Sequence, residues 1–123
     1  MKITSFNPQI ISKDAESVVR LLEEMGFDRR HTKEDIGELN VTGISMKNAD
    51  GFYVDVSETD AAKDKDIVAI RMNVDDFDSA YRLLKSRGYF NIYGAHTADT
   101  PSSKSAVLIS PNGLAINLIQ HIK

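Results

Sequence analysis

The sequence predicts an α+β fold made of two tandem βαβββ modules, because the chain repeats itself with a constant offset of 62 residues over its length of 123. The matching segments are 14–22 with 76–84, 26–27 with 88–89, and 50–51 with 112–113. Such a period is too long for a solenoid, and two copies are too few. We expect a single domain at 1–123, with a first module at 1–60 and a second module at 66–123.

The first module is expected to begin with a strand and a helix. Residues 3–12 are rich in apolar and β-compatible side chains, which indicates a strand. Asp14 is a typical N-cap residue, and Gly26 is a typical residue just beyond the end of a helix. Between them, apolar side chains recur at helical spacing: Ala15, Val18, Val19, Leu21, Leu22 and Met25.

Three further strands are expected in the first module. The polar and basic segment 27–33 suits an exposed edge strand, and a strand at 41–47 follows a loop at 34–40. Residues 52–57 alternate apolar and polar side chains, as a half-buried strand does. Asp50-Gly51 between the last two strands is a strong signal for a tight hairpin. The charged, alanine-rich segment at 58–65 is expected to link the modules.

The second module is predicted to repeat this order. The expected elements are a strand at 66–74, a helix at 76–87, strands at 89–95, 105–110 and 114–121, and a turn at 111–113. The polar segment 96–104 is expected to be a loop, either a plain connection or a mobile lid over a binding site.

The composition excludes several classes of protein. Apolar residues make up 41% and charged residues 27%, with a net charge of −3 and no basic stripe, so we expect no nucleic acid partner. Cysteine is absent, which excludes disulfides, thiolate metal sites and cysteine nucleophiles. There is no signal peptide pattern and no apolar run of membrane-spanning length. We therefore expect a cytoplasmic protein that has no membrane segment.

A duplicated βαβββ module with a capped helix ending in Gly-aromatic resembles the vicinal oxygen chelate superfamily, which includes glyoxalases, bleomycin-resistance proteins and extradiol dioxygenases. Residues 74–81 resemble the family's entry to the second helix, and 110–118 resemble its final hairpin. The resemblance implies two half-barrels around a shared cavity, and it implies a homodimer. It is more specific for fold than for activity, because the superfamily hosts many chemistries on one scaffold.

Metal-dependent members carry His or Glu ligands on the first and last strands of each module. The four matching positions here hold Asn7, Asp55, Ala69 and Asn117. Alanine cannot coordinate, and carboxamides bind transition metals poorly, whereas a catalytic zinc site needs about three good protein ligands. The resemblance therefore implies that no metal cofactor is bound. The alternative is a divalent metal at a displaced site around Asp55, with His121 as a further ligand.

Strand alternation predicts which side chains face the cavity. The expected ligand-binding residues are Asn7, Gln9, Tyr53, Asp55, Arg71, Asn117 and His121. Arg71 is the expected contact for an anionic ligand, because a guanidinium suits a carboxylate or a phosphate. The alternatives are an Arg71–Asp55 ion pair between the modules and a solvent-exposed His121. The opposite faces are expected to pack under the helices, with Phe52, Val54, Val56, Ile70, Met72, Val74, Ile116 and Leu118.

Three functions remain open at this point. The first is a binding protein that holds a small, anionic molecule in the cavity without a metal. The second is a metal-dependent lyase, isomerase or dioxygenase with a displaced metal site. The third is an accessory protein whose dimer surface matters more than its cavity. No residue pattern in the sequence identifies catalytic residues, because no nucleophile elbow, phosphate loop or zinc-protease motif is present.

Overall fold

The computed structural model describes residues 1–36, 41–62 and 64–122 and confirms the α+β fold class. Contacts between residues divide the chain into two compact units. The N-terminal unit is Asn7–Val68, and the C-terminal unit combines Met1–Phe6 with Ala69–Lys123. Both divisions fall inside strands, so the sequence-based module boundaries at residues 60 and 66 stay predictions.

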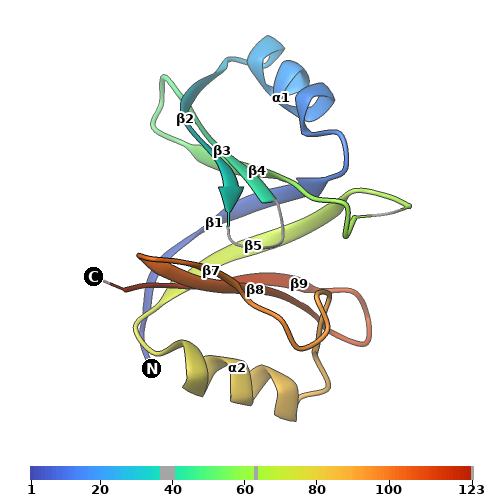
Figure 1. Ribbon diagram of the computed structural model, residues 1–123. Coiled ribbons are helices and arrows are strands. Elements are labelled where there is room, and N and C mark those ends of the chain that lie inside the picture. The colour runs from blue at the N-terminus through green and yellow to red at the C-terminus, as the bar shows by residue number, and fades with distance from the viewer. Residues whose placement is uncertain (37–40, 63, 123) are drawn as a thin grey trace. The chain divides into compact units, whose positions relative to one another are not determined.

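The N-terminal unit contains one helix and a mixed sheet. Strand β2 (Phe27–Ile36) pairs antiparallel with β3 (Val41–Asn48), and β3 pairs antiparallel with β4 (Tyr53–Glu58). Strand β4 also pairs parallel with the second half of β1 (Ile3–Ser12). Helix α1 (Ala15–Glu24) covers one face of this sheet (Figure 1). Among the described residues β2 pairs with β3 alone, which confirms that this polar strand is an edge.

Local signals in the sequence fix the ends of α1. The side chain of Asp14 accepts a hydrogen bond from the backbone N–H of Ser17 at 3.3 Å, as an N-cap residue does. The backbone N–H of Ala15 donates to the carboxylate of Glu58 at 3.1 Å, which satisfies a second free donor of the first turn. Gly26 follows the helix with a φ of 101°, a left-handed conformation that favours glycine.

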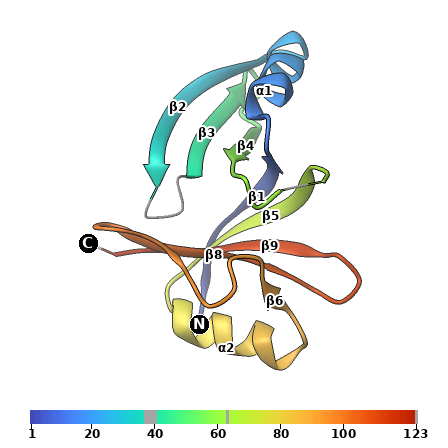
Figure 2. The same cartoon turned by 45° about the vertical axis from the view of Figure 1, so that its right-hand side comes forward.

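The C-terminal unit also contains one helix and a mixed sheet. Strand β5 (Ile67–Val74) pairs parallel with β9 (Ala115–His121), and β9 pairs antiparallel with β8 (Ser103–Ile109). Helix α2 (Phe77–Ser86) runs along one face of this sheet, as Figure 2 shows. Two short strands lie antiparallel to β8, namely β6 (Phe90–Asn91) and β7 (Ala98–Thr100).

The predicted repeat appears in the structure as equivalent hydrogen bonds. The backbone N–H of Phe77 donates to the side chain of Gln120 at 2.8 Å, in the same way as Ala15 donates to Glu58. The hairpins before the last strand of each module close with bonds from Asn48 to the Phe52 carbonyl and from Ser110 to the Leu114 carbonyl. Each of these pairs is separated by the same offset of 62 residues, so the repeat extends from sequence to backbone geometry.

The predicted strand at 89–95 is wrong over most of its length, because only the two residues of β6 are extended there. The buried side chain of Asn91 is the physical reason. Its amide N–H group donates to the carbonyl of His96 at 2.9 Å, and its oxygen accepts from the backbone N–H of Tyr93 at 2.9 Å. These bonds offer the backbone an alternative to the strand ladder and hold a turn.

The predicted loop at 96–104 is also wrong, because it contains β7 and the start of β8, which form an antiparallel hairpin. Ordered hydrogen bonds hold this segment, including one of 2.8 Å between the hydroxyls of Thr100 and Ser103. The structure therefore gives no support to a lid at 96–104. In the first module, residues 34–36 of the expected loop extend β2, and residues 37–40 lie outside the described residues. None of the described helices is both long and apolar enough to cross a membrane.

Candidate functional site

The sheet of the N-terminal unit has one apolar face and one polar face. The apolar face packs against α1 in a cluster of Ala15, Val19, Ile44, Met46, Val54 and Val56. The opposite face carries Asn7, Gln9, Ser45, Asp55 and Ser57, which we call the Asp55 face. Asp55 is only 7% exposed, although a charged side chain is rarely buried unless it is paired.

Strand register brings these polar side chains together. Asp55 on β4 lies opposite Gln9 on β1 and opposite Ser45 on β3. Ser57 lies two residues farther along β4, on the same face as Asp55. Directly opposed residues point to the same face of a sheet, with their Cβ atoms roughly 5 Å apart. The alternation in sequence predicted this face correctly for Asn7, Gln9 and Asp55.

Hydrogen bonds fix the orientation of the Asp55 carboxylate. The Ser45 hydroxyl donates to Asp55 Oδ1 at 3.0 Å, and the Asn7 amide donates to Asp55 Oδ2. Beside them, the buried Gln9 amide donates to the Ser57 hydroxyl at 2.6 Å. Each of these donors is an electrically neutral group, and together they orient the carboxylate on the sheet.

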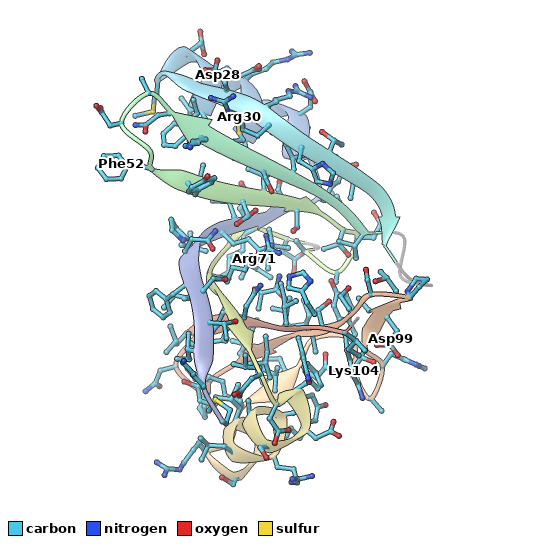
Figure 3. All side chains as sticks on the ribbon, turned by 90° about the vertical axis from the view of Figure 1, so that its left-hand side faces the viewer. Asp28, Arg30, Phe52, Arg71, Asp99 and Lys104 are labelled. Carbon is cyan, nitrogen blue, oxygen red and sulfur yellow. The ribbon has the colours of Figure 1, made fainter. Side chains whose placement is uncertain are left out.

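Tyr53 and Phe52 lie toward the hairpin end of the N-terminal unit. Tyr53 is about half exposed, and the ammonium group of Lys47 lies 5.1 Å from the centre of its ring, within cation–π distance. Phe52 was expected to pack under the helix, and this prediction is wrong, because it is 65% exposed. Figure 3 shows its ring projecting away from the sheet, because Phe52 lies in the turn just before β4 begins.

The sheet of the C-terminal unit also has a polar side. Met72 and Val74 on β5 pack with α2, so Arg71 and Asn73, which alternate with them along the strand, point to the opposite face. Arg71 lies opposite Asn117 on β9, and we call this side of the sheet the Arg71 face. Figure 3 shows Arg71 on the side of the sheet away from α2. The side chain of Arg71 is half-buried.

One polar atom on the Arg71 face stands out. The oxygen Asn73 Oδ1 is buried, and within the described ranges 1–36, 41–62 and 64–122 it has no hydrogen-bond partner. Buried acceptors of this kind are uncommon in folded proteins. Strand alternation places Asn73 on this face, but no pattern in the sequence indicates that its oxygen lacks a donor.

The remaining predicted residues have different outcomes. His121 is exposed at the end of β9, where the alternative interpretation placed it. The Arg71–Asp55 ion pair, which was the alternative to a ligand contact at Arg71, stays a prediction. Sequence reasoning did not select Ser45, because its contact with Asp55 depends on the register between β3 and β4.

The structure shows where the four expected metal-ligand positions lie. Asn7 and Asp55 share the Asp55 face, and Asn117 lies on the Arg71 face. Ala69 is buried on β5 and cannot coordinate a metal. Across the part of the chain that the structure describes, no group of three or more His, Cys, Asp or Glu side chains could hold a metal ion.

Comparison with known proteins identifies the fold. No protein family model matches the chain, and no curated protein matches it by sequence. Methylmalonyl-CoA epimerase from Streptomyces coelicolor, in complex with 2-nitronate-propionyl-CoA, matches with a TM-score of 0.64 and 20% identity over 97% of this chain and 98% of that chain. The Mycobacterium tuberculosis epimerase matches with a TM-score of 0.64 and 13% identity over 96% of this chain and 88% of that chain.

Two further solved structures support the same conclusion. A methylmalonyl-CoA epimerase in complex with methylmalonyl-CoA and ammonium has a TM-score of 0.64 and 19% identity, covering 97% of this chain and 95% of that chain. A hypothetical protein from Bacillus halodurans has a TM-score of 0.63 and 12% identity, covering 98% of this chain and 97% of that chain. The epimerases are members of the vicinal oxygen chelate superfamily, so the chain has the fold that the sequence resemblance implied.

Proposed function

We propose that this chain binds a small acidic molecule, that Arg71 contacts the acidic group, and that no metal ion takes part. The observation that carries the proposal is the polarity of the two sheet faces opposite the helices. One face holds the buried Asp55 carboxylate in a hydrogen-bonded network, and the other carries Arg71 beside Asn117. Polar groups on such faces cost stability unless they are paired or serve a ligand.

The ligand class follows from the chemistry of Arg71. Its guanidinium presents a planar fork of N–H donors that matches a carboxylate or a phosphate. Two of the structural neighbours were solved with coenzyme A thioesters, which carry phosphates, and methylmalonyl-CoA also carries a carboxylate. Acyl-CoA thioesters are therefore candidates for this chain, together with small carboxylic acids and phosphate esters.

A binding screen with one matched variant tests the proposal. We would measure the shift in Tm with small carboxylic acids, phosphate esters and acyl-CoA thioesters, and then titrate the best ligand by calorimetry. The variant is Arg71→Gln, because Gln9 occupies the equivalent position in the first module. A hydrogen bond to a charged group contributes about 1.5–3 kcal/mol, so the affinity should fall by roughly 10- to 100-fold.

The control is Arg82→Gln, which removes an exposed arginine from α2 and should leave the affinity unchanged. If Arg71→Gln bound the acid as tightly as the unmodified protein, the assignment of Arg71 would be wrong. If no acid of the three classes bound at all, the proposed function would be wrong.

The metal-free part of the proposal has its own measurement. Elemental analysis of the purified protein should find no stoichiometric metal, and added zinc, manganese, iron, nickel or magnesium should leave its Tm unchanged. This expectation is supported by Asn7, Ala69 and Asn117 at three of the four family ligand positions. A near-stoichiometric metal would instead favour the displaced site around Asp55 and a metal-dependent lyase, isomerase or dioxygenase.

The remaining expectations from the sequence also stay proposals. A homodimer is expected from the family resemblance, and light scattering coupled to size-exclusion chromatography would measure it. The cytoplasmic location is expected from the composition, in which cysteine is absent. Fractionation of the source cells would test it.

A further inference from the structure

We infer that Asn73 is a specificity-determining residue of the Arg71 face and accepts a hydrogen bond from an N–H or O–H group of the bound acid. This inference rests on the proposed function and narrows its ligand class. The ligand would be an acid that also carries a hydroxyl or amide N–H group close to its acidic end.

The first observation is the state of the Asn73 side chain. Its Oδ1 atom is buried, and no donor among the described residues reaches it. An unsatisfied buried acceptor costs the protein the desolvation of that group, and a fold retains it only for a reason. A donor on a bound molecule would remove the cost, so binding would be coupled to the presence of that donor.

The second observation is the repeat, which shows that the fold does not need a polar residue here. The equivalent position in the first module is Ile11, which is 1% exposed. An apolar, β-branched side chain is therefore accepted at this place in the strand, where it packs well. The second module, which also carries Arg71, has the polar Asn73 at this position instead of an apolar residue.

The third observation is the position of Asn73 relative to Arg71. The two residues are separated by one residue on β5 and point to the same face of the sheet. Alternate residues of a strand are roughly 7 Å apart, a spacing that one small molecule can bridge. Ile119 lies opposite Asn73 on β9, so the neighbouring strand offers an apolar side chain rather than a donor.

Taken together, these residues select a ligand with two features. Arg71 favours an acidic group, and Asn73 favours a donor a few atoms away. A site whose polar group needs a donor discriminates strongly against analogues that lack it, because the acceptor then stays unsatisfied in the complex. An acid without the hydroxyl or amide group should therefore bind more weakly than its donor-bearing counterpart.

The test uses Asn73→Ile, which installs the residue of the first module, in the whole chain of residues 1–123. Without any ligand, the Tm of this variant should rise by roughly 3 °C, because an unsatisfied buried acceptor is replaced by an apolar side chain. An unchanged or lower Tm would overturn the inference, since it would mean that water or a protein group already satisfies the oxygen.

The second arm compares acids that differ by one hydroxyl group. We would measure the affinities of malate against succinate, and of lactate against propionate, together with the best acid from the screen and its analogue without the donor. The unmodified protein should prefer the donor-bearing acid by roughly tenfold or more, and Asn73→Ile should remove this preference.

The outcomes separate the two proposals. If acids bind through Arg71 but Asn73→Ile leaves the preference unchanged, the inference about Asn73 is wrong and the proposed function stands. If no acid binds, the proposed function and the ligand class inferred here both fail, whatever the Tm of the variant. A further variant, Ile11→Val in the first module, controls for substitution in the equivalent strand and should leave the preference intact.

Discussion

The two units use almost the same apolar face but very different polar faces. The equivalent pairs under the helices are Ile44 with Ala106, Met46 with Leu108, Val54 with Ile116, and Val56 with Leu118. On the other side of the sheets, the equivalent pairs are Gln9 with Arg71, Ile11 with Asn73, Asp55 with Asn117, and Ser57 with Ile119. The helix-covered faces therefore preserve residue character, whereas the opposite faces have diverged.

The difference shows which positions the fold constrains. A helix packed on a sheet requires apolar side chains of suitable volume at each contact, because protein cores are closely packed. The opposite face is free of this requirement, and a polar residue is tolerated wherever a partner satisfies it. In a duplicated chain, the positions that differ between equivalent faces are accordingly the best candidates for specific function.

Among substitutions that test this difference between the units, Asp55→Ala should have the largest effect on stability. The substitution removes the carboxylate that accepts hydrogen bonds from the Ser45 hydroxyl and the Asn7 amide, both of which are partly buried. We expect the free energy of unfolding to fall by about 2 kcal/mol, measured by urea denaturation. Asp55→Asn, which installs the residue of the second module, keeps one acceptor oxygen, so the free energy of unfolding should fall by a smaller amount.

The control for this prediction is Asp60→Ala, because Asp60 is exposed. A rise in stability on Asp55→Ala would contradict the prediction. It would instead indicate that the fold holds a carboxylate at a net cost, as proteins often do where a charge serves binding.

A smaller difference should separate the two glycines that follow the helices. Gly26 and Gly88 both have positive φ angles, of 101° and 87°, so alanine should destabilise the protein by about 1 kcal/mol at either position. A Cβ atom at Gly88 would also lie 3.3 Å from Cγ of Pro111, whereas a Cβ atom at Gly26 would meet nothing within 4 Å. We therefore expect Gly88→Ala to lower the Tm more than Gly26→Ala, and the opposite order would contradict this account.

The smallest expected difference between the two units lies in the hydrogen bonds of their helix N-cap residues. The backbone N–H and the hydroxyl of Ser79 donate to the carboxylate of Asp76 and lower its pKa below the ordinary value. The stability that this cap contributes is present above the ordinary pKa of the carboxyl group, and it is lost as the pH falls through the lowered pKa. Ser79→Ala removes one donor, so the pKa of Asp76 should rise toward its ordinary value.

The measurement is the NMR titration of the Asp76 carboxyl carbon. Ser17→Ala is the matched control in the first module, where the serine hydroxyl donates to the backbone carbonyl of Asp14 rather than to its carboxylate. This variant should leave the titration of Asp76 unchanged. An unchanged titration in Ser79→Ala would show that the backbone N–H alone accounts for the lowered pKa.

Much of the fold was predictable because its signals are local. The N-caps Asp14 and Asp76 and the glycines at the helix ends depend on residues a few positions apart. The segment around Asn91 was not predictable, because its side chain holds a turn by bonding to a carbonyl five residues away. A composition compatible with a strand does not reveal such competition between a side chain and the backbone.

For the candidate site, the sequence could predict only which face of the sheet a side chain lies on, because strand alternation determines that. Alternation placed Asn7, Gln9 and Asp55 on one face; the strand register confirmed this for Gln9 and Asp55, and the hydrogen bond to Asp55 confirmed it for Asn7. The contact of Ser45 with Asp55 requires the pairing of two strands, and the missing donor at Asn73 depends on every side chain around it. Periodicity contains neither kind of information.

The division of β1 between the two units has a consequence for how the protein can be dissected. The N-terminal unit is one continuous segment, whereas the C-terminal unit is assembled from both ends of the chain. Lys2 anchors the first of these pieces, exchanging hydrogen bonds of 3.0 Å and 2.6 Å with Asp75 at the end of β5. A fragment that holds only the second repeat would lack this anchor. A circular permutant that joins the original termini and opens between residues 68 and 69 would instead carry each unit as an unbroken stretch of chain.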